Sequence, residues 1–150
     1  GKGPPYPVST DLIDELKAET PAEYHAILDD LFNHIILFSN KITSCSIRQL
    51  APGRQQLTLQ IECRKLESDE KGTEREVPFE QAIEIGAFTA AGDHRKYGEA
   101  LYRKMHRLKS GTNTVVFETA EIPDNVAVDP FFMLIDRNIA DNVITPSVDR

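Results

Sequence analysis

Apolar and polar residues alternate on both sides of a proline-glycine turn in the first half of the chain. This feature constrains the fold most strongly. Before the turn, Cys45 and Ile47 alternate with polar residues, and Ala51-Pro52-Gly53-Arg54 supplies turn-forming residues. After the turn, every second position is again apolar: Leu57, Leu59, Ile61 and Cys63. Successive side chains of a strand point to opposite faces, so the pattern predicts an antiparallel hairpin with one buried face.

Both cysteines, Cys45 and Cys63, fall on the buried face of this hairpin. They could lie close together across the strands, so a disulfide bond is one alternative. Two free buried thiols are the favoured alternative, because free thiols pack well and a cross-strand bridge requires a strained geometry. The spacing forms no Cys-x-x-Cys pair, and a structural zinc site is not predicted.

Further strand patterns follow in the second half of the chain. Residues 78–87, 101–108 and 114–120 each predict a strand, and turn signals separate the predicted strands at intervals of roughly ten residues. We therefore expect residues 39–150 to form a mainly β domain. The expected architecture is an antiparallel β-sandwich of the immunoglobulin-like kind, preceded by a short helical hairpin.

Helical spacing characterises residues 8–38. A first helix is expected over about residues 10–18, and Thr20-Pro21-Ala22-Glu23 is typical of the start of a second one. The second helix carries an apolar stripe: Tyr24, Ile27, Leu28, Leu31, Ile35 and Phe38. A helical pair this short cannot bury both faces alone, so it must dock on the β domain or on a helical neighbour. Residues 1–7 are typical of a linker or a cloning remnant.

Charge and hydropathy limit what the chain can bind. The formal net charge of −7 gives no overall attraction to nucleic acids or anionic membranes. The longest apolar run, residues 131–135, is much shorter than the roughly 18 residues of a membrane-spanning helix. Any membrane-anchoring or export segment would therefore lie outside these residues.

The sequence contains no pattern typical of an active site. A zinc hydrolase motif, His-Glu-x-x-His, places two imidazoles one helical turn apart beside a general base. The four histidines are not spaced in this way: His25, His34, His94 and His106. The glycines form no phosphate-binding loop, and Cys45 is predicted to face the core rather than solvent. We expect no enzymatic activity from this chain, and no catalytic, cofactor-binding or metal-binding residue in it.

Positive charge is concentrated in residues 94–109 of this acidic chain. The residues that could dock a partner are Arg103, Lys104, Arg107 and Lys109. In one interpretation they bind an acidic protein or anionic lipid headgroups. In the other, which is the commoner use of such cations, they line a sheet edge and oppose pairing with another chain. Nucleic-acid binding is not expected, because interleaved aromatic residues are lacking.

Bulky apolar residues near the end of the chain lie between an Asp-Pro pair and a polar cluster. We expect Asp129 and Pro130 to form a turn, after which residues 131–135 close the core as a strand or turn. Asp136, Arg137 and Asn138 would then form hydrogen bonds with local backbone groups.

This stretch also carries a family resemblance. Residues 129–138, Asp-Pro-Phe-Phe-Met-Leu-Ile-Asp-Arg-Asn, with the later Asp141-Asn142-Val143, resemble the extreme C-terminus of certain bacterial membrane proteins. Those proteins fuse an ABC-transporter permease to an aminopeptidase-N-like (gluzincin) zinc metallopeptidase domain. The likeness extends to residues 31–38, 76–86 and 106–111, and so to nearly the whole chain. The two cysteines depart from the family pattern.

The resemblance implies that residues 8–38 end a preceding α-domain behind the peptidase site, and that residues 39–150 form a C-terminal β-sandwich. The family's zinc-binding motif would lie upstream, so the chain itself is expected to hold no cofactor. The expected partner is the preceding peptidase or helical domain of the same chain. The expected location is a soluble domain of a bacterial membrane protein; the sequence does not determine the side of the membrane, and the extracytoplasmic side is favoured.

Two functions are therefore expected from the sequence. The first is a non-catalytic C-terminal domain that supports or orients the zinc peptidase domain of the membrane-anchored parent. The alternative is a stand-alone interaction module that docks an acidic partner or a membrane surface through its basic strand.

Overall fold

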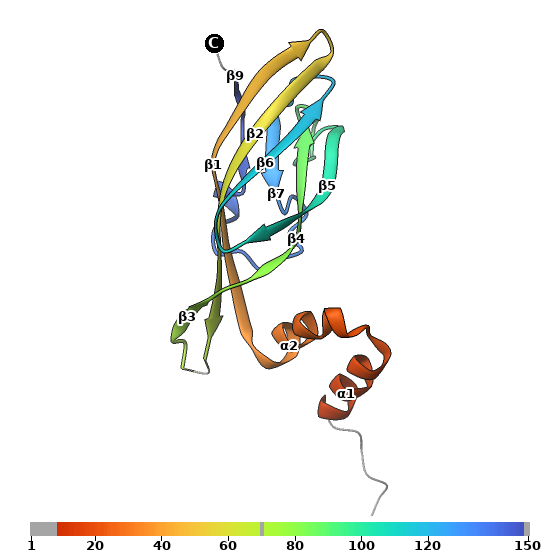
Figure 1. Ribbon diagram of the computed structural model, residues 1–150, viewed down its shortest axis with the longest axis vertical. Coiled ribbons are helices and arrows are strands. Elements are labelled where there is room, and N and C mark those ends of the chain that lie inside the picture. The colour runs from red at the N-terminus through yellow and green to blue at the C-terminus, as the bar shows by residue number, and fades with distance from the viewer. Residues whose placement is uncertain (1–8, 70, 149–150) are drawn as a thin grey trace, which may run out of the picture.

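Strands dominate the computed structural model, which describes residues 9–69 and 71–148 (Figure 1). Helix α1 (Ser9–Glu19), the 3-10 helix η1 (Ala22–Tyr24) and helix α2 (His25–Asn33) come first. The strands that follow are β1 (Ile35–Ala51), β2 (Arg54–Ser68), β3 (Glu74–Val77), β4 (Glu80–Phe88), β5 (Ala100–Lys109), β6 (Gly111–Thr119), β7 (Asn125–Val128), β8 (Val143–Ile144) and β9 (Ser147–Val148), with the 3-10 helix η2 (Ile139–Asp141) before β8. The expected mainly β class, with a short helical segment before the strands, is confirmed.

The strands form two sheets. In the first sheet, β1 lies between β2 and β9, and the other edge of β2 pairs with β3 near one end and with β6 along the rest. The second sheet has the order β5-β4-β7-β8. The long β1–β2 hairpin is antiparallel, as predicted, and Gly53 adopts a φ of 71° at its turn, where a side chain would be strained.

Side chains from both sheets form one hydrophobic core. The alternating positions of the predicted hairpin face it, since Ile47, Leu57, Leu59 and Ile61 are all fully buried. The second sheet contributes Ile83, Ile85, Ala87, Leu108, Val126 and Val128. Burial of such apolar side chains is the main driving force for folding, so this shared core fixes the two sheets relative to each other.

The two cysteines are buried and free. They do not face each other across the hairpin, because Cys45 is paired with Leu59 and Cys63 with Asn40. The disulfide alternative is therefore not realised. Burial raises the pKa of Cys45 to about 11 and that of Cys63 to about 12.

The predicted helical segment, residues 8–38, extends too far, and its first residue lies outside the described part of the chain. Helix α2 ends at Asn33, and β1 begins two residues later at Ile35. Ile35 and Ile36 pair with Ser68 and Glu67 of β2, so strand pairing by β-branched residues overrides their helical spacing. Thr20 also forms no cap, because η1 begins after Pro21 without a side-chain capping bond.

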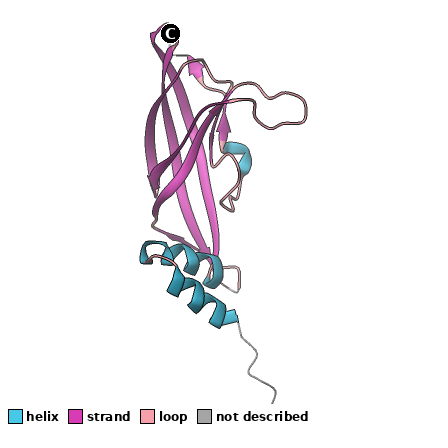
Figure 2. Ribbon diagram, turned by 90° about the vertical axis from the view of Figure 1, so that its right-hand side faces the viewer, coloured by secondary structure: helices cyan, strands magenta, loops and turns pink. Residues whose placement is uncertain are grey.

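Helices α1 and α2 lie at one end of the molecule, beyond the sheets (Figures 1 and 2). No helical side chain that the structure describes is buried. An ion pair between Asp30 and Lys65 connects α2 to β2, and His34 Nδ1 lies 2.8 Å from Glu67 Oε1. Neither α1 nor α2 is long and apolar enough to cross a lipid bilayer, and no other described helix is.

Candidate functional site

The predicted docking cations all lie on β5, which is an edge strand of the second sheet. Arg103 donates to Glu84 of β4 at 2.8 Å, and the Arg107 guanidinium lies 3.5 Å from Glu80 of the same strand. Lys104 falls on the opposite face of β5 from Arg103, Arg107 and Lys109, because alternate residues of a strand face opposite sides. The four cations therefore do not form one continuous surface, and two of them already have carboxylate partners.

Asp129 organises the tight turn that follows β7. Its backbone has a φ of 46°, and its buried carboxylate accepts hydrogen bonds from the amides of Met133, at 3.0 Å, and Leu134, at 2.8 Å. The Asp129 amide itself donates to the Glu84 carbonyl at 2.8 Å. Pro130, also buried, continues the turn. One carboxylate thus fixes five residues of irregular backbone against β4.

The next polar residues attach this segment to β1. Asp136 accepts hydrogen bonds from the amides of Asn40 and Asn138, both at 2.9 Å. The Arg137 amide donates to the Phe38 carbonyl at 2.9 Å, while the Arg137 side chain pairs with Glu74. Asn138 caps η2 by accepting from the Ala140 amide. These bonds join the end of the chain to β1 of the first sheet.

The expectation that residues 131–135 close the core is wrong for most of them. Leu134 packs against the core, but the other four side chains are exposed: Phe131, Phe132, Met133 and Ile135. The Asp129 turn has a compact backbone that directs these side chains outward. Two aromatic residues and a methionine therefore face solvent beside the second sheet.

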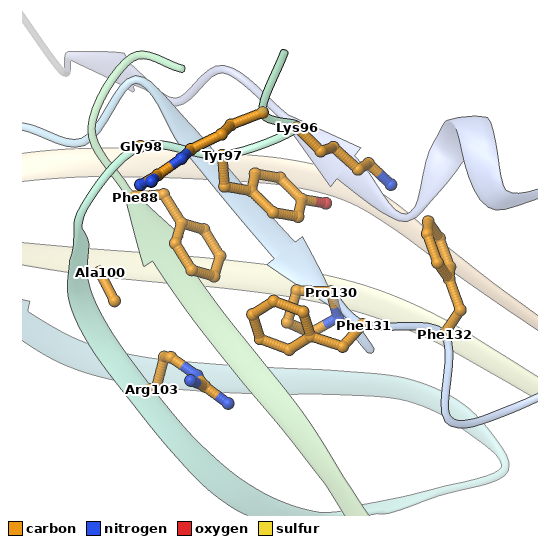
Figure 3. Close-up of a pocket in the computed structure, with 10 residues that line it drawn as sticks. Phe88, Lys96, Tyr97, Gly98, Ala100, Arg103, Pro130, Phe131 and Phe132 are labelled. Carbon is orange, nitrogen blue, oxygen red and sulfur yellow. The ribbon is translucent and has the colours of Figure 1, made fainter. Parts of the chain in front are cut away.

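Phe131 and Phe132 line a hollow on the outer face of the second sheet (Figure 3). Its volume is about 480 Å³, within the range of small-ligand sites. Four segments supply its lining: the end of β4, the connection from β4 into β5, β5 itself and the Asp129 turn. The lining residues are Phe88, Arg95, Lys96, Tyr97, Gly98, Ala100, Arg103, Pro130, Phe131 and Phe132.

The aromatic wall of the hollow is fixed by packing. Phe88 is buried, and its ring stacks on Tyr97 with the ring centroids 4.4 Å apart. The Phe131 ring meets both of these rings edge to face, at 6.2 and 6.5 Å. Gly98 allows this arrangement, because a Cβ atom there would lie 2.2 Å from the Ala90 carbonyl oxygen.

Cations lie against the aromatic rings. The Lys96 ammonium is 3.9 Å from the centre of the Phe132 ring, and the Arg103 guanidinium is 4.4 Å from that of Phe131. Partial burial lowers the pKa of Lys96. Within the described part of the chain, neither Lys96 nor Arg95 forms an ion pair, whereas Arg103 is paired with Glu84. The arrangement can hold an anion beside a flat apolar group.

The positively charged segment predicted from the sequence includes Arg95 and Lys96, but no sequence pattern connects these residues with an aromatic site. The nearest signal was the run Arg95-Lys96-Tyr97, a tyrosine beside two cations. The other aromatic residues come from positions distant in sequence, and Phe131 was assigned to the core. The hollow becomes visible only when the Asp129 turn is placed next to β4.

The histidines are dispersed. His106 Nε2 lies 2.8 Å from the Tyr102 hydroxyl, and His25 Nε2 lies 2.8 Å from the Thr20 carbonyl oxygen. Over residues 9–69 and 71–148, no group of three or more His, Cys, Asp or Glu side chains is placed to hold a metal ion.

Comparison of the chain with protein-family models, curated proteins and solved structures found no match.

Proposed function

We propose that this chain is a non-catalytic β domain that supports or orients a preceding zinc peptidase domain of the aminopeptidase-N-like kind in a membrane-anchored parent protein. Two independent features support the proposal: the resemblance of the C-terminal stretch to that family, and the exposed apolar residues of the helical segment. The two sheets with a common core are compatible with the finer proposal of an immunoglobulin-like sandwich.

The exposed helices are the structural observation that carries the proposal. Three of their apolar side chains are about half exposed: Leu12 by 55%, and Ile27 and Phe32 by 47% each. The β domain does not need these residues, because its core is complete without them. Amphipathic helices gain most of their stability by burying an apolar face, so these two need a further surface. In the proposal that surface is the preceding helical domain of the same protein.

In the proposal, zinc is bound by the preceding peptidase domain and not by this chain. In this proposal no catalytic step is assigned to the residues of this chain. The β domain would act through rigidity. Its long hairpin contacts α2 through the Asp30–Lys65 pair, so a helical domain that covers α1 and α2 would be connected to the sheets through these helices.

The proposal is tested on the native gene product. The residues encoded before Gly1 should include His-Glu-x-x-His, preceded by several membrane-spanning segments. In the longer protein, Ile27→Asp should lower the thermal stability of the peptidase domain, because it places a charge in the proposed contact. Ile122→Asp is a matched control, since Ile122 is 53% exposed and lies between β6 and β7, outside the helices. An upstream sequence without the motif, or equal effects of the two substitutions, would contradict the proposal.

One specific observation favours the alternative function, which is docking of an acidic partner or membrane through β5. Lys104 and Lys109 form no ion pair with any described residue. Salt-sensitive binding to anionic vesicles, compared between the native chain and a charge-reversed Arg103, Lys104 and Arg107 variant, tests it. Equal binding by the two proteins would show that the β5 cations do not mediate binding.

A further inference from the structure

We infer that the hollow beside the Asp129 turn is a binding site for a short acidic peptide segment that contains an aromatic residue. The peptide carboxylates would lie against Lys96 and Arg95, and its ring would pack among Tyr97, Phe131 and Phe132. This site shares Arg103 with β5 but contains none of the other three β5 docking cations, and it does not depend on the proposed function.

The hollow is preformed. Its floor is the buried pair Phe88 and Pro130, which cannot move without disturbing β4. The connection that carries Tyr97 is tied to the end of β4 by hydrogen bonds from the Gly98 amide to the Thr89 carbonyl, at 3.1 Å, and from the Glu99 amide to the Thr89 hydroxyl, at 2.8 Å. Preorganised walls reduce the entropy lost when a ligand binds.

The hollow is positively charged. The lining contains three cations and no carboxylate, although acidic residues outnumber basic ones by 24 to 17 in the chain. Glu84 neutralises only Arg103. Lys96 lies over aromatic rings, where its ammonium loses hydration without gaining an anion. An incoming carboxylate would supply that missing partner and form charge-assisted hydrogen bonds.

The hollow also exposes aromatic surface to which an apolar part of the ligand could bind. The Phe131 and Phe132 side chains are 47% and 44% exposed, so an aromatic ring from a partner could remove substantial apolar area from water. Aromatic side chains and arginines often supply most of the binding energy of a protein interface when they lie in well-packed, desolvated pockets. An acidic residue next to an aromatic one satisfies both requirements at once.

A peptide fits these observations better than a lipid surface does. The cations and rings of the hollow surround a concave space (Figure 3), whereas a bilayer would contact protruding side chains. Met133 protrudes next to the hollow and is 81% exposed, as a side chain that inserts into a lipid surface would be. The experiment therefore distinguishes peptide binding from lipid binding.

The test uses the complete chain, which contains no tryptophan, so that tryptophan fluorescence reports the peptide alone. Acetyl-Glu-Trp-Glu-amide should bind saturably, and binding should weaken as salt is raised. Acetyl-Lys-Trp-Lys-amide should not bind. Acetyl-Glu-Phe-Glu-amide should displace the tryptophan peptide, and acetyl-Glu-Ala-Glu-amide should compete at least about fivefold less well.

Variants locate the site. Lys96→Gln should weaken binding about fivefold and Phe131→Ala about tenfold, because they remove the anion partner and the ring wall. Lys104→Gln is the matched control on β5 and should leave the affinity unchanged. The exposure of Lys96 and Phe131 makes both variants compatible with folding, and circular dichroism checks this. Chemical-shift changes at the Tyr97 and Gly98 amides give a second readout that needs no substitution.

Three results would overturn the inference. The first is the absence of saturable binding by the Glu-Trp-Glu peptide, and the second is equal binding by the lysine peptide. The third is binding of the chain to phosphatidylserine vesicles that Lys96→Gln abolishes and the acidic peptide does not displace. That last result would assign the hollow and Met133 to a lipid surface.

Discussion

At the scale of single residues, burial determines the chemistry of the two thiols. Cys63 and Cys45 lie in the core, where their pKa values rise from an ordinary 9.0 to about 12 and about 11. The thiolate is the reactive form, so we expect neither residue to react with Ellman's reagent in the native protein at neutral pH. Both should react after unfolding in urea. Rapid labelling of the native chain would contradict the buried placement.

The same thiols make stability depend on alkaline pH. A group whose pKa is raised by folding holds its proton more tightly in the folded chain, so its contribution is complete below pH 9.0 and is lost above it. We therefore expect the free energy of unfolding to fall between pH 9 and pH 11, and to fall less steeply in Cys63→Ala. Urea unfolding at several pH values measures both slopes, and identical slopes would show that Cys63 does not contribute.

Asp129 is the residue on which the C-terminal turn depends. Replacement by alanine removes the acceptor for the Met133 and Leu134 amides and leaves a non-glycine residue at a φ of 46°. We expect a loss of about 2 to 4 kcal/mol in the free energy of unfolding by urea. Asp129→Asn should lose less, because asparagine tolerates this conformation and keeps one acceptor oxygen. The exposed Asp124→Ala is the control and should be nearly neutral.

At the scale of elements, β4 and its neighbours position the hollow. A Cβ atom on Gly86 would lie 2.5 Å from the Phe88 ring, which is confined by Tyr97. Gly86→Ala should therefore destabilise the protein by about 1 to 3 kcal/mol and disturb the near-ultraviolet circular dichroism of the stacked rings. Gly92→Ala, where no atom lies within 4 Å of the added carbon, should do neither. Similar melting temperatures for the two variants would contradict the close packing of Phe88 on Gly86.

Elements governed by local pattern could be predicted from the sequence, whereas those governed by distant contacts could not. The alternation from Cys45 to Cys63 determines one buried face, and the hairpin follows directly. Ile35 has helical spacing, but its partner Ser68 lies 33 residues away in sequence, and pairing with it makes the segment a strand. Apolarity alone placed Phe131 in the core, because the sequence does not reveal that Asp129 turns the backbone outward. The hollow combines side chains from the end of β4, the following connection, β5 and the Asp129 turn, so no local pattern could indicate it.

At the scale of the whole molecule, the β domain and the helical segment differ in how they are stabilised. The sheets share a continuous core, while α1 and α2 contribute no described buried side chain and lie beyond the sheets (Figure 2). The contacts of α2 with β2 include the partly buried ion pair between Asp30 and Lys65, in which the desolvation of the two charges offsets much of their attraction. We therefore expect the β domain to be stable without the appended pair of helices, whose apolar residues are not buried.

Deletion of residues 1–33 tests this division. We expect the shortened chain to keep the near-ultraviolet circular dichroism of the β domain and to unfold in urea in one cooperative transition, with a free energy lowered by less than about 2 kcal/mol. Hydrogen exchange in the intact chain should be fast throughout α1 and α2 and slow in β1 and β2, because exposed helices open independently of the core. In the longer parent protein the same helical amides should become protected, since there the helices would be covered by the preceding domain. A deletion that abolishes cooperative unfolding would show instead that the helices belong to the β domain, and the proposed contact with a preceding domain would lose its main structural support.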